Sequence, residues 1–187
     1  MLARRHELMD AALQLFIEQG ITATSVDQIV KSAVVAKGTF YLYFESKEGL
    51  LAALQERFIT SFCTHTQRAL DRHRPDQWRA RLKAWVGASI ECYLDQMAVH
   101  DVVFHDFHPE DREQVNANPV VAQLAAFLTA GTQADAWTVR NPHVTAIMLF
   151  SAMHGAVDDA VANDRTPDRP RLTRTVAEFF EKVLGLS

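Results

Sequence analysis

The chain has 187 residues, of which 48% are hydrophobic and 22% are charged, and its formal net charge at pH 7 is −4. That length permits one large domain or a small domain joined to a larger one. The N-terminus is charged and amphipathic, and polar residues break the longest uncharged run, so we expect neither a signal peptide nor a membrane span. Cys63 and Cys92 lack the spacing of a disulfide framework or a zinc site. We therefore expect a cytoplasmic protein without cofactors.

Helical periodicity extends along the whole chain, and strand alternation is absent. Gly20 is a natural stop for the first helix, Ser25 and Gln28 form a capping box at the second, and Ser46 caps a long one. The predicted helices span 3–19, 25–33, 37–44, 46–71, 76–99, 119–138, 142–163 and 168–185, with 100–118 short and irregular. We therefore predict an all-α fold of about nine helices.

The second and third predicted helices are short and joined by a brief turn, which is the arrangement of a helix-turn-helix. Phe40 and Phe44 lie four positions apart, so they should anchor the third helix, while Tyr41 and Tyr43 project outward. Tyrosine hydroxyls and lysine ammonium groups are good partners for DNA phosphates. Residues 1–47 carry as many basic as acidic side chains, so the acidic balance of the chain does not oppose DNA binding here.

This segment resembles the DNA-binding signature of the TetR family of bacterial regulators. The resemblance covers roughly residues 4–55 and is carried by the stretches TSVDQI (24–29), KGTFY (37–41) followed by Phe44, and SKEGLL (46–51). It implies a three-helix helix-turn-helix DNA-binding domain over 1–46, followed by a helical ligand-binding and dimerisation domain over 47–187. The implied function is that of a homodimeric transcriptional repressor, released from operator DNA by a small-molecule effector. No arrangement of residues indicates an enzyme, and no catalytic residue is proposed.

The DNA contacts divide into two kinds. Thr39 and Gly38 should face base edges and Leu42 could touch a thymine methyl group, whereas the lysines and tyrosines should contact phosphates. The full set of predicted DNA-binding residues is Thr24, Ser25, Lys37, Gly38, Thr39, Tyr41, Leu42, Tyr43 and Lys47.

Two positions depart from the family's pattern. Val34 occupies the turn position at which the family usually has glycine, and Ala36 replaces the usual serine or threonine cap of the recognition helix. A β-branched residue in a left-handed turn conformation is strained by ~1–2 kcal/mol. A lost cap costs ~1 kcal/mol. Either the turn is therefore remodelled, or the domain is less rigid without DNA.

Aromatic and sulfur-containing side chains after residue 75 form core by default, but they also suit a pocket for a largely apolar effector. The predicted ligand-binding residues are Trp85, Ser89, Tyr93, Met97, Phe104, His105, Phe127, Met148 and His154. The segment from His100 to Asp111 is rich in histidine and aspartate and allows three interpretations: a polar loop, a contribution to this pocket, or a metal site. Its histidines lack the spacing of helical zinc ligands, so no metal residue is proposed.

The last two predicted helices suit a self-complementary dimer interface, although an intrachain core is the simpler interpretation. One helix carries small residues along an edge, and the other is apolar on nearly all sides. The predicted interface residues are Ser151, Ala152, Gly155, Ala156, Asp159, Val176, Phe179, Phe180 and Val183.

The expected partners are double-stranded operator DNA, an apolar small molecule and a second copy of the chain, without a membrane. Two alternative functions stay open: a DNA-binding regulator without an effector, and a metal-binding protein that uses the segment from His100 to Asp111.

Overall fold

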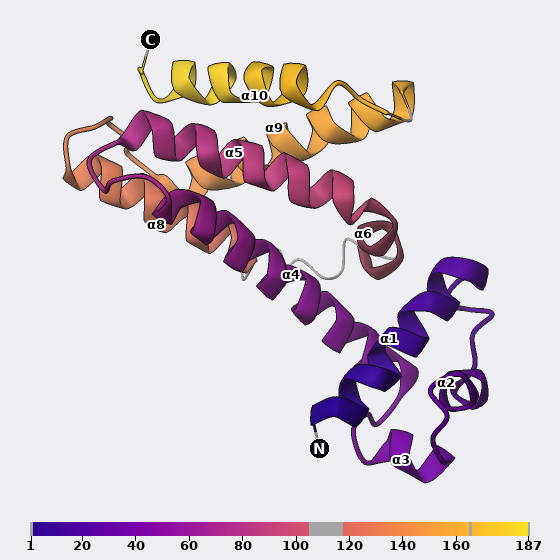
Figure 1. Cartoon of the computed structure of the whole chain (residues 1–187). Coiled ribbons are helices and arrows are strands. Elements are labelled where there is room, and N and C mark those ends of the chain that lie inside the picture. Colours follow the sequence, from indigo (N-terminus) through magenta and orange to yellow (C-terminus); the bar gives the residue numbers. More distant parts are fainter. Residues whose placement is uncertain (1, 105–117, 165, 187) are drawn as a thin grey trace. The chain divides into compact units, whose positions relative to one another are not determined.

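The computed structural model describes residues 2–104, 118–164 and 166–186. Every regular element in these ranges is a helix, which confirms the predicted all-α class (Figure 1). The helices of the described residues are α1 (Leu2–Gln19), α2 (Val26–Ser32), α3 (Lys37–Tyr41), α4 (Lys47–Asp71), α5 (Trp78–Asp95), α6 (Met97–Phe104), α8 (Pro119–Gln133), α9 (Pro142–Asn163) and α10 (Arg169–Val183).

The chain divides into two compact units. The first holds residues 2–60 and 96–104, and the second holds the described residues of 61–95 and 118–186. The domain boundary predicted after residue 46 falls at the start of α4, whereas α4 begins in the first unit and ends in the second. A single continuous helix therefore belongs to both units.

The first unit is built from α1, α2, α3, the start of α4, and α6. Its core contains the fully buried side chains of Leu8, Phe16, Ile29, Phe40 and Leu50. α1 packs against α2 and α6, and α2 packs against α3. The helix-turn-helix is thus held to a common core from both sides of its turn.

α6 corrects one prediction from the sequence. The predicted helix over 76–99 ends earlier, because α5 stops at Asp95 and a separate helix begins at Met97. Part of the segment expected to be irregular is therefore helical. The rings of Phe58, His100 and Phe104 lie with centroids 5.0–5.7 Å apart, and Gln55 Nε2 donates a hydrogen bond to the Val103 carbonyl at 2.6 Å. These contacts fix α6 to α4.

The predicted capping residues and helix stop of the first unit are confirmed. Ser25 Oγ accepts a hydrogen bond from the Gln28 amide at 3.3 Å, and the Gln28 side chain accepts one from the Ser25 amide at 2.8 Å. Ser46 Oγ accepts from the Gly49 amide at 3.1 Å. Gly20 ends α1 in the left-handed conformation with φ of 85°, which glycine adopts without steric cost. α3, however, ends at Tyr41, earlier than residue 44.

The turn between α2 and α3 is strained rather than remodelled. Val34 has φ of 54°, in the left-handed region that a β-branched side chain disfavours, and its side chain is 85% exposed. Ala36 precedes α3 without any side-chain cap. Both departures noted in the sequence therefore occur in the structure with the geometry that makes them costly.

We predict that Val34→Gly stabilises the protein by ~1 kcal/mol, because the relief of backbone strain exceeds the extra unfolded-state entropy of glycine. Urea denaturation should show a higher midpoint. Val35→Gly is the matched control: this neighbouring valine lacks a positive φ, so its replacement should lower the midpoint. A lower urea midpoint for Val34→Gly as well would show that Val34 is not strained in this turn.

The second unit is built from the end of α4 with α5, α8, α9 and α10. α8 packs on α9, and α10 packs on both α5 and α9. Glu181 of α10 is almost fully buried, and Arg79 of α5 donates to its two carboxylate oxygens, each at 2.8 Å. Lys83 Nζ lies 3.3 Å from the same carboxylate. These two basic side chains compensate the buried charge that would otherwise oppose the packing of α10 on α5.

α9 carries apolar surface that its own chain leaves uncovered. It is the one helix among the described residues that is long and apolar enough to cross a membrane, a property that core helices of soluble proteins share. Only 22% of its most apolar 18-residue stretch is buried inside the chain. Val144 and Met148, four positions apart, are both exposed. The exposed side of α9 is therefore apolar at one end.

Candidate nucleic-acid interface

The short helix α3 separates buried aromatic side chains from exposed polar ones. Phe40 is fully buried and Phe44 is buried, with ring centroids 5.7 Å apart. The amides of Tyr43 and Phe44 both donate to the Phe40 carbonyl at 3.0 Å, so a tight turn brings Phe44 back to the core. The predicted inward orientation of the two phenylalanines is confirmed.

The exposed side of α3 consists of the residues predicted to contact DNA. Lys37, Gly38, Tyr41 and Leu42 are exposed, and Thr39 and Tyr43 are partly exposed. A Cβ atom placed on Gly38 would meet nothing within 4 Å, so this position faces open space. A helix that offers hydroxyl, ammonium and methyl groups with one glycine between them can approach DNA closely.

Lys37 forms an ion pair that the sequence does not reveal. Its Nζ lies 2.7 Å from Oδ1 of Asp27, on the neighbouring helix α2. The hydrogen bond to Asp27, together with the negative charge of that carboxylate, raises the pKa of Lys37 above its usual value. The two residues belong to different helices, so no helical spacing in the sequence indicates the pair.

Thr24 and Ser25 have roles inside the domain. Thr24 is buried, and its hydroxyl donates to the Gly20 carbonyl at 2.8 Å while it accepts from Gln19 Nε2 at 3.1 Å. The Thr24 side chain is therefore not available for a DNA contact, which corrects that prediction. Ser25 is exposed, but its hydroxyl is engaged in the capping box.

Lys47, the first residue of α4, is bonded to the loop between α1 and α2. Its Nζ donates to the carbonyls of Ile21 at 2.7 Å and of Thr24 at 2.9 Å. An ammonium group has three donors, so these two bonds leave one donor for another acceptor. Lys47 thus joins the start of α4 to the loop that precedes α2, whatever it contributes to a DNA contact.

We predict that Lys47→Met lowers the free energy of unfolding by about 1–3 kcal/mol, because the two carbonyls lose a charged donor. Lys47→Arg, which keeps the charge and donors, is the control and should lose less. Salt titration of DNA binding tests the other role: loss of one phosphate contact lowers the salt slope by about 0.9. An unchanged denaturation midpoint in Lys47→Met would contradict the structural role.

The residues predicted to bind a ligand fall in both units. Trp85, Ser89 and Phe127 are buried in the core of the second unit. Met97 and Phe104 lie on α6 in the first unit, and His105 lies outside the described residues. Met148 is exposed on α9, so it does not line a buried pocket in this chain.

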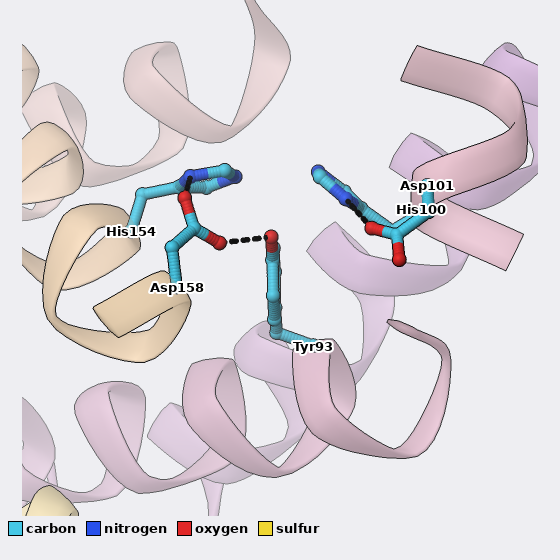
Figure 2. A network of polar contacts seen from close by, with 5 residues as sticks. All are labelled: Tyr93, His100, Asp101, His154 and Asp158. Atoms are coloured by element: carbon cyan, nitrogen blue, oxygen red, sulfur yellow. Dashed lines mark hydrogen bonds and ion pairs between the residues drawn. The ribbon is translucent and has the colours of Figure 1, made fainter. Parts of the chain in front are cut away.

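Tyr93 and His154, two of the predicted ligand-binding residues, share a polar network in the second unit. Figure 2 shows the Tyr93 hydroxyl pointing to Asp158, to which it donates at 2.6 Å, while His154 Nδ1 lies 3.2 Å from the other oxygen of that carboxylate. The Tyr93 and His154 rings meet edge-on at 4.8 Å. Asp158, on α9, was not identified from the sequence. The network joins α5 to α9.

The predicted dimer residues divide between core and surface. Val176 and Phe180 are buried inside the chain, because α10 turns them toward its own unit, so they cannot form an interface with a second copy. Phe179 and Val183 are each 47% exposed. On α9, Ser151, Ala152, Gly155 and Asp159 are exposed and Ala156 is partly exposed.

The metal hypothesis concerns a segment that is mostly outside the described residues. His100 and Asp101 are described, and His100 Nδ1 lies 3.4 Å from Asp101 Oδ1. In residues 2–104, 118–164 and 166–186, no three histidine, cysteine or acidic side chains come together in a way that could hold a metal ion.

The strongest matches to curated relatives cover only a short part of the chain. The model for the tetR family of bacterial regulatory proteins matches residues 8–54. The HTH-type transcriptional regulator YvdT of Bacillus subtilis is 43% identical over 54 residues, which is 29% of this chain and 28% of that protein. The matches span less than a third of the length of the first curated relatives.

A relative and several solved structures match over nearly the full length. The fatty acid metabolism regulator protein of Bacillus subtilis is 25% identical over 184 residues, covering 93% of this chain and 92% of that protein. The crystal structure of FadR from Bacillus subtilis in complex with stearoyl-CoA has a TM-score of 0.77 at 23% identity, covering 92% of this chain and 95% of that one. The helix-turn-helix, its signature and the family model agree: residues 8–54 match the tetR family of bacterial regulatory proteins.

Proposed function

We propose that this chain is a cytoplasmic transcriptional repressor that binds operator DNA through α3 and is released by a largely apolar small molecule. The exposed polar side of α3, held in place by buried Phe40 and Phe44, is the observation that carries the proposal. The match of residues 8–54 to a family of regulatory proteins supports a binding role without catalysis. Repression is the simplest mode, because a protein bound at an operator excludes others from the same DNA.

The proposed effector is a compound with a long apolar part. FadR, whose fold is similar, was solved with stearoyl-CoA, a molecule of this kind. In this chain, the aromatic side chains of Trp85 and Phe127 lie in the second unit together with the Tyr93, Asp158 and His154 network. An apolar interior with a few polar groups suits an amphiphilic ligand.

We expect the purified protein to bind DNA that flanks its own gene in preference to random duplex of equal length, and stearoyl-CoA to reverse that binding. Fluorescence anisotropy of labelled DNA measures both, with free coenzyme A as the control for the polar part of the ligand. A ligand that prefers the DNA-incompetent state a hundredfold shifts the equilibrium by about 2.7 kcal/mol per site.

Three results separate the alternatives. Equal affinity for flanking and random DNA would refute a sequence-specific regulator. Specific binding that neither stearoyl-CoA nor a library of apolar compounds changes would favour a regulator without an effector. Metal analysis that finds a bound ion in stoichiometric amount would favour a metal-binding protein.

We further propose that the chain binds DNA as a homodimer through the exposed sides of α9 and α10. Val144 and Met148 on α9 and Phe179 and Val183 on α10 are large apolar residues left exposed by the single chain. Exposed apolar surface of this kind is typical of protein interfaces. Two copies related by a two-fold axis would present two α3 helices to successive major grooves about 34 Å apart.

Phe179→Glu should convert the dimer into a monomer, because an unpaired charge buried at the interface costs several kcal/mol. Light scattering should report half the original mass, and operator affinity should collapse. Ile17→Glu is the matched control, since Ile17 is an exposed apolar residue of the first unit, 40% accessible, and its replacement should leave the mass unchanged. A folded Phe179→Glu protein that stays dimeric would place the interface elsewhere.

A further inference from the structure

The DNA-facing segment carries little positive charge. Residues 24–47 contain three lysines and no arginine, together with Asp27 and Glu45. Lys47 gives two of its donors to the carbonyls of Ile21 and Thr24. Lys31 is exposed on α2. Lys37 is the first residue of α3. Electrostatic attraction between this helix and the DNA backbone therefore depends chiefly on Lys37.

That lysine is already paired with an anion of its own domain. Lys37 Nζ and Asp27 Oδ1 are 2.7 Å apart, and the two side chains are 55% and 70% exposed. The pair bridges the second residue of α2 and the first residue of α3, the two helices of the helix-turn-helix. Because both groups are exposed, Lys37 can leave Asp27 for another anion without any opening of the core.

We propose that Asp27 competes with DNA phosphate for the Lys37 ammonium and so lowers the affinity of this interface for DNA of any sequence. The inference rests on the proposed DNA-binding function. When Lys37 turns to a phosphate, the Asp27 carboxylate loses its partner and stays near the negatively charged backbone. Both effects oppose binding, and neither depends on the bases. Asp27 thus weakens binding to all DNA sequences alike and leaves the preference among them unchanged.

The inference has a signature in salt dependence. Interactions between exposed charges are screened at high salt, so the effect of Asp27 should be largest at low ionic strength. An acidic side chain beside the DNA cancels part of the counterion release that a nearby lysine produces. Removing that charge should therefore steepen the salt slope, by at most about 0.9 for each DNA-bound copy.

The experiment compares Asp27→Asn with Asp10→Asn in the full chain. Asp10 is a close match: it is 66% exposed, lies in the same unit and pairs with Arg57 at 2.6 Å, so its replacement removes the same charge and also frees a basic partner. Anisotropy titrations with flanking DNA and with random duplex, from about 50 to about 200 mM salt, give affinity and slope. Circular dichroism confirms that each variant is folded.

We expect Asp27→Asn to tighten binding to both DNAs about two- to fivefold for each bound copy at low salt, the range typical of exposed pairs. Asp10→Asn should change affinity less. In a Lys37→Gln background, Asp27→Asn should lose most of its effect, because the competition acts through Lys37.

If the wild-type chain binds DNA, three results would overturn the inference. Weaker binding by Asp27→Asn would mean that Asp27 positions Lys37 for DNA. An equal gain in Asp10→Asn would reduce the effect to net charge, and a full gain in the Lys37→Gln background would exclude Lys37 as the target. If the wild-type chain binds no duplex at all, the proposed function fails first and this inference fails with it.

Discussion

The burial of Phe40 and Phe44 is the contact on which the DNA-facing surface depends. A helix of five residues is not stable alone, because nucleation costs more than a single turn returns. α3 exists because Phe40 is fully buried against the first unit, and because the turn after Tyr41 returns Phe44 to the same core. The positions between and before them, Lys37, Gly38 and Tyr41, are then exposed by geometry. The same short segment therefore buries its phenylalanines in the core and exposes its polar residues to solvent.

The features that the sequence predicted well are those fixed by neighbouring residues. A capping box needs only Ser25 and Gln28, and a helix stop needs only Gly20, so both are visible as local patterns. The unusual turn at Val34 was indicated only by the family resemblance, because the family usually has glycine at that position, and its left-handed conformation came from the structure. The family resemblance added the function, which local patterns alone would have left as a generic helix-turn-helix.

The features that the sequence could not predict depend on partners far along the chain. Nothing in the spacing of residues tells that the Lys47 ammonium bonds to carbonyls 23 and 26 positions earlier, or that Lys37 meets Asp27. On α10, adjacent Phe179 and Phe180 look equivalent, yet only the way α10 lies on α5 buries Phe180 and exposes Phe179. Ligand and dimer residues chosen by residue type were therefore mixed with core residues.

The buried ion pair between α5 and α10 has a consequence for acid tolerance. The hydrogen bond from Arg79 holds the pKa of Glu181 below its usual value, against the opposing effect of burial. A carboxyl group whose folded-state pKa is depressed contributes stability above its unfolded-state pKa and loses it as the pH falls through the folded-state value. Protonation would leave two cationic side chains without their common anion. The packing of α10 on α5 should therefore weaken in acid. The first unit has no equivalent buried carboxylate among its described residues.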